Sequence, residues 1–223
     1  MAYPLTFIVH SGMALLACLA LSFQAISAID MRPHIAVIDN SESYVEIINT
    51  GEQTEYVAIT LYRLNNPGVP PDKESLTPLG ITVQPLLFVA PMKLALGVNQ
   101  RGRIALKARG APDQEQVYRL SVMPQRNLTA SGEKGAVIGV QIAYMGLVRH
   151  LPKKPVPQWH HTCEREGILL YNNGNIRLSW KNLQIIDNFN LYPNQQRQLG
   201  VHKITGNVEG NPVNLSCQRS FRE

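Results

Sequence analysis

The sequence has little charge and few aromatic residues, and it lacks the motifs of common enzyme classes. Only 17% of its 223 residues are charged and 7% are aromatic. It has no glycine-rich phosphate loop and no serine nucleophile elbow, so nothing in it favours an enzyme. Its 21 basic residues lie singly or in short pairs such as Lys153-Lys154, although the formal net charge is +5. We therefore expect neither catalysis nor a nucleic-acid-binding surface.

Long apolar runs are also missing, because none reaches the roughly 20 residues needed to cross a bilayer. The longest run, from Met13 to Ile26, is followed by the small residues Ser27 and Ala28. This pattern is typical of a secretory signal peptide, although no Lys or Arg precedes the run. A lipid-anchored Cys18 is the alternative interpretation. We expect residues 1–28 to be removed and the mature chain to be exported in soluble form.

Cysteine is scarce, and the three cysteines leave only Cys163 and Cys217 in the mature chain. Two cysteines in an exported protein most simply pair, so we expect a disulfide in the last third of the sequence. A zinc site at His160, His161 and Cys163 is the alternative. Zinc needs four donors, and the other histidines and cysteines are distant in the sequence. We therefore expect no metal and no cofactor.

Apolar residues of the mature chain never sustain a helical spacing. Short segments with alternating or β-branched apolar residues recur about every ten residues, which predicts an all-β fold. The expected strands of the first part of the chain are Ile35 to Ile38, Tyr44 to Asn49, Tyr56 to Leu64, Phe88 to Ala90, Gly102 to Lys107, Gln116 to Met123 and Val137 to Arg149.

Proline divides the chain. Five prolines between Asn65 and Pro85 predict a long loop, because proline cannot donate to a β-ladder. Pro152, Pro155 and Pro157 predict a stiff linker at 153–157, which separates a domain at 29–152 from a smaller one at 158–223. The strands expected in the smaller domain are Gly167 to Tyr171, Ile176 to Trp180, Leu183 to Ile186, Gln198 to Ile204 and Pro212 to Cys217, with a hairpin turn at Asn172 to Asn175.

The segment from Gly135 to Arg149 predicts an unusually long strand. Its alternation places Val140, Ile142, Tyr144, Gly146 and Val148 on one face, and Gln141, Ala143, Met145 and Leu147 on the other. Such a strand either forms the centre of a sandwich or presents an edge to a partner chain. The second interpretation predicts β-augmentation, in which a partner segment joins the edge.

Three runs resemble periplasmic chaperones of the chaperone–usher pathway, most closely the non-classical branch that serves colonization-factor fimbriae. The runs are VQIAYMGLVRHLP (140–152), EQVYRLSVMP (115–124) and YNNGNIR (171–177). An FVAP motif at Phe88 to Pro91 and a basic strand at Arg101 to Lys107 occur in the same order as in that family. The resemblance covers nearly the whole mature chain.

The resemblance implies a boomerang of two immunoglobulin-like β-sandwich domains. It also implies that the strand from Val137 to Arg149 is donated to a fimbrial subunit that lacks its own final strand. Basic residues in the cleft between the domains would hold the terminal carboxylate of that subunit. Arg149 matches one such position, while Arg119 and Arg32 are the candidates for a second. A guanidinium can bind a carboxylate through two parallel hydrogen bonds.

We expect Val140, Ile142, Tyr144 and Val148 to enter the groove of the subunit, with their own domain's core as the alternative location. Ile35 and Val37 would contact the other side of the subunit. The expected partners are fimbrial subunits and an outer-membrane usher, and the expected compartment is the periplasm. The free protein would self-associate if its apolar edge stayed uncovered. The alternative function is that of a secreted immunoglobulin-like fimbrial subunit or adhesin.

Overall fold

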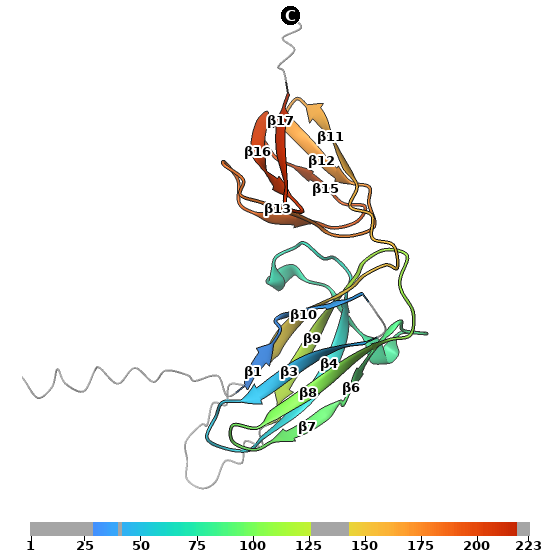
Figure 1. Ribbon diagram of the computed structural model, residues 1–223, viewed down its shortest axis with the longest axis vertical. Helices are drawn as coiled ribbons and strands as arrows, with labels where there is room; N and C mark the ends of the chain where they lie inside the picture. Colours follow the sequence, from blue (N-terminus) through green and yellow to red (C-terminus); the bar gives the residue numbers. More distant parts are fainter. Residues whose placement is uncertain (1–28, 40–41, 126–142, 218–223) are drawn as a thin grey trace, which may run out of the picture.

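The computed structural model describes residues 29–39, 42–125 and 143–217. The predicted signal peptide, Val140 and Ile142 lie outside these residues, as does the start of the predicted long strand. The chain forms two β-sandwiches, which confirms the predicted fold class (Figure 1). Within the described residues, no helix has the length and apolar character required to span a membrane.

The first sandwich consists of two sheets. One has the strand order β1-β3-β8-β6, and the other has the order β2-β10-β9-β4-β5, with β7 also pairing with β4. Strands β2 and β10 run parallel, and the other pairs are antiparallel. The strands are β1 (Ile29–Arg32), β2 (Ile35–Ile38), β3 (Glu42–Asn49), β4 (Glu55–Leu64), β5 (Leu76–Pro78), β6 (Leu87–Ala90), β7 (Lys93–Leu96), β8 (Arg101–Ala108), β9 (Gln116–Pro124) and β10 (Tyr144–His150).

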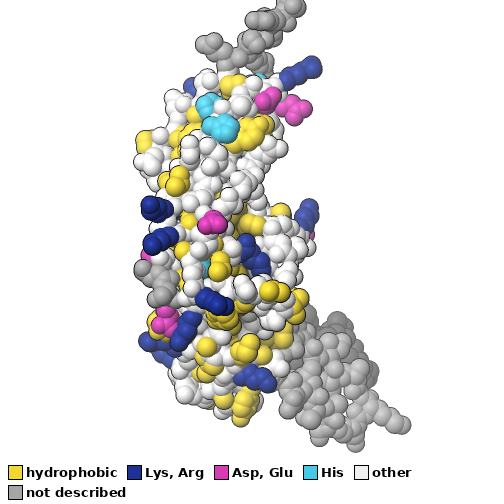
Figure 2. All heavy atoms as spheres, turned by 90° about the vertical axis from the view of Figure 1, so that its right-hand side faces the viewer, with side chains coloured by type: hydrophobic (Ala, Val, Ile, Leu, Met, Phe, Trp, Pro, Cys, Tyr) yellow, Lys and Arg dark blue, Asp and Glu magenta, His cyan; other side chains and the backbone are white. Residues whose placement is uncertain are grey.

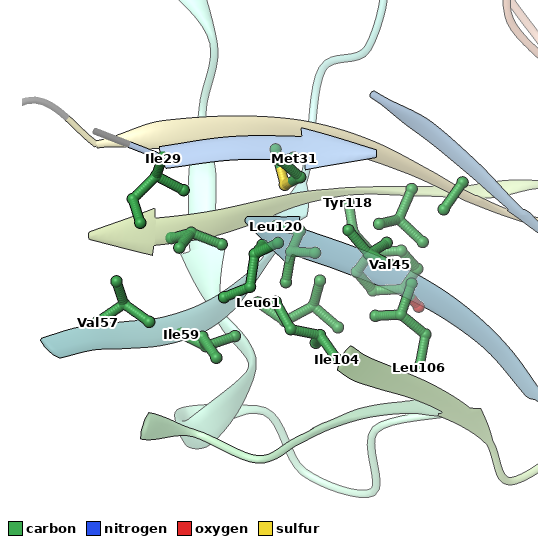
Figure 3. Packing of buried hydrophobic residues seen from close by; sticks show 14 of the residues in the cluster. Ile29, Met31, Val45, Val57, Ile59, Leu61, Ile104, Leu106, Tyr118 and Leu120 are labelled. Atoms are coloured by element: carbon green, nitrogen blue, oxygen red, sulfur yellow. The ribbon is translucent and has the colours of Figure 1, made fainter. Parts of the chain in front are cut away.

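Alternation of apolar residues builds the core of this sandwich. On β4, Val57, Ile59 and Leu61 are buried, while the residues between them lie on the outer face of the sheet. Figure 3 shows these side chains meeting others from β1, β3, β8 and β9 in the layer between the sheets. Burial of a large aliphatic side chain contributes about 2 kcal/mol. The apolar layer therefore fixes which face of each strand turns inward.

The second sandwich is smaller and packs around Trp180, whose side chain is fully buried. One sheet has the order β11-β12-β15, and the other has the order β14-β13-β16-β17. The predicted disulfide is confirmed, because Cys163 on β11 is bonded to Cys217, which follows β17. The strands are β11 (Trp159–Glu164), β12 (Gly167–Asn172), β13 (Leu178–Lys181), β14 (Phe189–Leu191), β15 (Gln196–Gln198), β16 (Lys203–Val208) and β17 (Asn211–Ser216).

The predicted hairpin at Asn172 to Asn175 is wrong, because β12 and β13 belong to different sheets. The Asn172 side chain donates to the carbonyl oxygens of Ile176 and Leu191, and this satisfies backbone groups where the chain crosses between sheets. Gly174 is in close contact with the segment before β11, since a Cβ there would lie 2.2 Å from the carbonyl oxygen of Val156. The Asn-Gly sequence thus serves a close approach between backbones.

Two other predicted strands differ from the structure. Leu183 to Ile186 is not a strand, and its two terminal side chains pack on the core from a bend. The single strand expected from Gln198 to Ile204 is divided into β15 and β16. Gly200, which has a positive φ of 68°, lies in the break between them. In the first sandwich, β1 was not predicted, and the loop before Pro85 contains the short strand β5.

The disulfide provides a test of the second sandwich. Replacing Cys163 and Cys217 with Ala should lower its free energy of unfolding by about 4 kcal/mol, because the bond closes a loop with a sequence separation of 54. Both tryptophans, Trp159 and Trp180, lie in this sandwich. Tryptophan fluorescence during urea denaturation therefore reports on it selectively. An unchanged midpoint would show that the bond does not contribute to stability.

Candidate functional site

Strand β10 occupies a position next to the edge of its sheet, and only part of it is covered by β2. Its residues Tyr144 to His150 pair with β9. On the other side, β2 pairs with Leu147 to His150, and the Leu147 backbone N–H donates to the carbonyl oxygen of His34. Met145 and Gly146 lie beyond the end of β2. Within the described residues, no strand pairs with Met145 or Gly146 on that side, so a partner chain could reach this part of β10.

The two faces of β10 have different environments. Val148 is 1% exposed and belongs to the core, and Tyr144 packs partly against the same core. Gly146 shares this face, where a Cβ would lie 3.0 Å from the terminal methyl of Met31. Val148 therefore lies in the core of its own domain, which was the alternative location, and this placement argues against Val148 as a subunit contact.

The outer face of β10 and β2 carries exposed apolar side chains. Ile35 and Val37 on β2 are 50% and 40% exposed, and Met145 on β10 is 42% exposed. The strand register places Leu147 opposite Ile35 on this face. Two strands thus present a continuous apolar surface beside the uncovered part of β10. We name the surface formed by Ile35, Val37, Met145 and Leu147 the apolar edge.

Arg149 ends the outer face of β10 and binds a carboxylate of its own chain. Its Nε and Nη2 atoms donate to Glu115 at 2.6 Å and 2.8 Å. The Glu115 side chain has no exposed surface, whereas that of Arg149 is 14% exposed. Burial lowers the pKa of Arg149, but the hydrogen bond and charge of Glu115 outweigh this effect and raise it above its ordinary value. Arg149 is therefore charged and already paired.

Glu115 also connects the two sandwiches. Its second carboxylate oxygen accepts a hydrogen bond of 2.7 Å from the backbone N–H of Arg177, which lies just before β13. The backbone N–H of Glu115 donates to the carbonyl oxygen of Asn175. A buried carboxylate needs such donors, because its desolvation is otherwise costly. Glu115, whose charge Arg149 balances, therefore connects the two sandwiches through its hydrogen bonds with the backbone of Arg177 and Asn175.

Apolar contacts strengthen this junction. Tyr192 of the second sandwich is 5% exposed and packs with Leu64 and Val117 of the first, and Leu147 is packed against this group. Burial raises the pKa of Tyr192, although Arg177 opposes the shift. The Gln195 side chain donates to the carbonyl oxygen of Pro67 at 2.7 Å. The two sandwiches are therefore packed against each other at this junction.

The other two predicted anchors also have internal partners. Arg119 lies on the same sheet face as Arg149 and forms a two-point hydrogen bond with Glu74. The hydrogen bond to Glu74 raises the pKa of Arg119 above its ordinary value. Arg32 lies on β1 in the other sheet, is 72% exposed, and donates to Asp30 at 2.7 Å. The structure thus brings Arg119 and Arg149 to one face and leaves Arg32 elsewhere.

The histidines near Cys163 make contacts of other kinds. His160 stacks on the ring of Tyr171 with 4.7 Å between ring centroids, and Cys163 is bonded to Cys217. Within the described residues, no group of three or more His, Cys, Asp or Glu side chains could hold a metal ion. The site therefore consists of the apolar edge, the paired arginines and the packed junction.

No protein-family profile matches the chain. One curated relative, a CFA/I fimbrial protein of Escherichia coli that is named as a subunit, is 26% identical over 161 residues. These residues cover 70% of this chain and 66% of that protein, so the match spans slightly less than two thirds of the relative. The crystal structure of the class 5 fimbriae chaperone CfaA is 20% identical, with a TM-score of 0.68. The superposition covers 85% of this chain and 99% of CfaA.

The chain has the fold of a fimbrial chaperone. A second solved structure with this fold is the CsuC–CsuE chaperone–tip adhesion subunit complex of Acinetobacter baumannii, with 18% identity and a TM-score of 0.53. That match covers 84% of this chain and 96% of the other. The resemblance predicted from the runs at 115–124, 140–152 and 171–177 is confirmed by these likenesses.

Glu115 and Glu74, the carboxylates that bind Arg149 and Arg119, were not identified from the sequence. Glu115 and Glu74 are 34 and 45 residues away from the arginines they bind. Glu115 is the first residue of the run at 115–124 that also contains Arg119, and this position was the available signal. Arg177 ends the YNNGNIR run, but nothing in the run itself indicates a role for it. Its part in the junction depends on its backbone N–H, which any residue other than proline supplies.

Replacing Arg149 with Met should lower the free energy of unfolding by about 3 kcal/mol, because Glu115 would stay buried without its cation. The same change at Arg101, whose pair with Glu46 is largely exposed, should cost less than about 1 kcal/mol. Urea denaturation followed by circular dichroism measures both values. The double change Arg149→Met and Glu115→Gln should recover part of the loss. Equal effects at Arg149 and Arg101 would contradict a structural ion pair.

Proposed function

We propose that this protein is a periplasmic chaperone that binds fimbrial subunits by donor-strand complementation and delivers them to an outer-membrane usher. It binds a partner chain and performs no covalent chemistry. We propose residues 1–28 as its signal peptide, 29–152 and 158–223 as its two domains, and 153–157 as the linker. Export through the signal peptide would bring the mature protein to the periplasm.

One observation carries this proposal: the likeness to a fimbrial chaperone extends over 99% of the CfaA chain and includes both sandwiches. The solved structures of the same fold include chaperones bound to a tip adhesion subunit and to a pilin. The uncovered part of β10 gives the chain a place for the same kind of contact. An added strand there would gain main-chain hydrogen bonds from β10.

The apolar edge supports a specific form of this contact. Met145 points away from the protein's own core, so its side chain can fill a groove in a partner. Ile35 and Val37 lie on the neighbouring strand and can contact the same partner. Val140 and Ile142 stay proposed contacts, and Tyr144 lies at the margin of the core.

The arginines of the cleft stay proposed ligands of the subunit's terminal carboxylate. Arg149 and Arg119 lie on the outer face of the sheet, the same face as the apolar edge. Each would have to exchange an internal carboxylate for that of the subunit. Such an exchange replaces one ion pair with another, so its net gain is small. The role of Arg149 supported by its contacts is to hold Glu115 and, through it, the second sandwich.

A fimbrial structural subunit or adhesin is the second candidate, because the curated relative is named a fimbrial subunit. A structural subunit would be expected to have one incomplete sandwich and a donor extension. Two sandwiches joined by a packed junction favour the chaperone. Co-purification separates the two functions: a chaperone forms an equimolar complex with its subunit and is absent from washed fibres. Recovery in the fibres would identify a structural component.

Replacing Met145 with Glu should reduce recovery of the subunit complex by about tenfold, because a carboxylate would be buried in an apolar groove. The side chain is exposed in the free protein, so the variant should fold normally. Val98→Glu is the matched control, since Val98 is 51% exposed in the turn between β7 and β8. Complex recovered from a cognate-subunit co-expression is measured for all three proteins. Equal recovery from the Met145 variant would exclude this face of β10.

A further inference from the structure

His150 is the last residue of β10, and its side chain is buried although it can carry a charge. It is 1% exposed. Side chains alternate along β10, so His150 lies on the same face as Val148, whereas Arg149 lies on the outer face. His150 is therefore separated by the sheet from the apolar edge and from the ion pair of Arg149.

Three strands have an end beside His150. The strand registers place it opposite Ile38, the last residue of β2, and opposite Gln116, the first residue of β9. The backbone N–H of Leu151 donates to the carbonyl oxygen of Ile38 at 2.8 Å, which continues the contact between β10 and β2 by one residue. The His150 side chain thus closes one end of the core, and its position is tied to the pairing of β10 with β2.

A pocket of about 250 Å³ adjoins the His150 side chain. Segments that follow β2, β8 and β10 form its other walls, among them Asp39, Arg109 and Lys153. An imidazole ring is smaller than this volume. A change of side-chain rotamer would therefore give the ring a hydrated position outside the core.

The hydrogen bonds of His150 suit a neutral ring. The ring forms a hydrogen bond with the backbone of Gly110. Its Nδ1 atom is buried and has no hydrogen-bond partner in the described part of the chain. A neutral imidazole donates through one nitrogen only, whereas an imidazolium donates through both. Protonation would thus leave a charged N–H group buried without an acceptor, which is costly.

A cation on a neighbouring strand also opposes protonation of His150. The Arg63 guanidinium on β4 lies over the Tyr118 ring, with 5.3 Å between its central carbon and the ring centroid. Its Nη1 donates to the Tyr118 hydroxyl at 3.5 Å, and that hydroxyl donates to Gln116 at 2.5 Å. These partners are neutral, so they do not compensate the positive charge of Arg63.

The pocket beside His150 is also mainly cationic. Arg109 and Lys153 outnumber Asp39, the acid of its lining. Figure 2 shows Lys and Arg side chains singly or in small groups along one face of both sandwiches, and the formal net charge of the sequence is +5. A proton added to His150 would therefore enter a protein that is already positive, which disfavours the charged ring.

These contacts set the direction in which acid acts. Burial lowers the pKa of His150, the hydrogen bond with Gly110 partly opposes this, and the charge of Arg63 lowers the pKa further, so it lies below its ordinary value. When this end of the core opens, the hydrated ring regains its ordinary pKa and takes up a proton. The closed form therefore keeps its full stability above the ordinary pKa and loses stability as the pH falls toward the lowered value.

We propose that His150 makes the contact between β10 and β2 acid-sensitive. Acid protonates the ring, the ring turns out of the core toward the pocket, and the pairing of β10 with β2 loosens at Ile38 and Leu151. Because β2 borders the uncovered part of β10, looser pairing leaves more of β10 accessible to another strand. The sensitivity is a property of the free chain, so it holds whether or not the proposed function is correct.

Amide hydrogen exchange of the free protein, followed by nuclear magnetic resonance, tests this contact. The protection factor of the Leu151 amide should fall as the pH is lowered from about 7 to about 5.5, because opening takes up one proton, and this linkage limits the fall to about tenfold per pH unit. The Asn49 amide donates to Gln100 in the other sheet at 3.0 Å and should keep its protection. An equal fall at both amides would show that acid acts on the whole sandwich, and would overturn the proposal.

A substitution separates His150 from the other titrating groups. His150→Gln keeps a polar side chain but cannot be protonated, so the Leu151 protection factor should no longer depend on pH in this range. His160→Gln is the matched control, because His160 is exposed on β11 of the second sandwich. That variant should respond to acid as the unaltered protein does. If His150→Gln keeps the acid response, another group causes it and the proposal is wrong.

A direct titration covers the case in which His150→Gln does not fold. The ring proton resonances of His150 in the unaltered protein report its pKa, which should lie below the ordinary value because of burial. A pKa at or above the ordinary value would mean that the closed structure accommodates the charged ring. That result would overturn the proposal independently of any variant.

Discussion

The buried carboxylate of Glu115 is the interaction on which the arrangement of the two sandwiches depends. It has no exposed surface, so its charge must be balanced within the protein. The first sandwich supplies Arg149, and the second supplies the backbone N–H of Arg177. Separation of the sandwiches would leave this carboxylate without one of its donors. The contact between the two sandwiches is therefore a specific hydrogen-bonded junction.

Ion pairing within the chain also determines which basic side chains near the junction could bind a partner. Arg149 and Arg119 are bound to Glu115 and Glu74, so their presence alone does not create a free positive site. Within the described residues, Arg177 and Lys181 form no ion pair with a carboxylate. A basic residue at the end of a strand is thus insufficient to identify an anchor. Its function depends on whether the fold brings a carboxylate of the same chain beside it.

Much of the first sandwich could be predicted, because its strands have one buried face. The expected segments at 44–49, 56–64, 102–107 and 116–123 all lie within β3, β4, β8 and β9. Strand boundaries were predicted less well where side chains, in place of a neighbouring strand, bind the backbone. At Asn172, the side-chain amide donates to two backbone carbonyl oxygens where the chain crosses between sheets. In the site, the end of β10 was identified from its alternation, but alternation does not say whether Val148 or Leu147 turns inward. Glu115 could not be assigned, because ion pairing has no periodic signature.

Strand β2 constrains how any partner strand could join β10. It pairs with Leu147 to His150 and buries Ala36 and Ile38 in the core, at 2% and 1% exposure. Displacing β2 would expose these side chains and break the hydrogen bond between Leu147 and His34. A partner strand that leaves the core intact must therefore end its pairing where β2 begins.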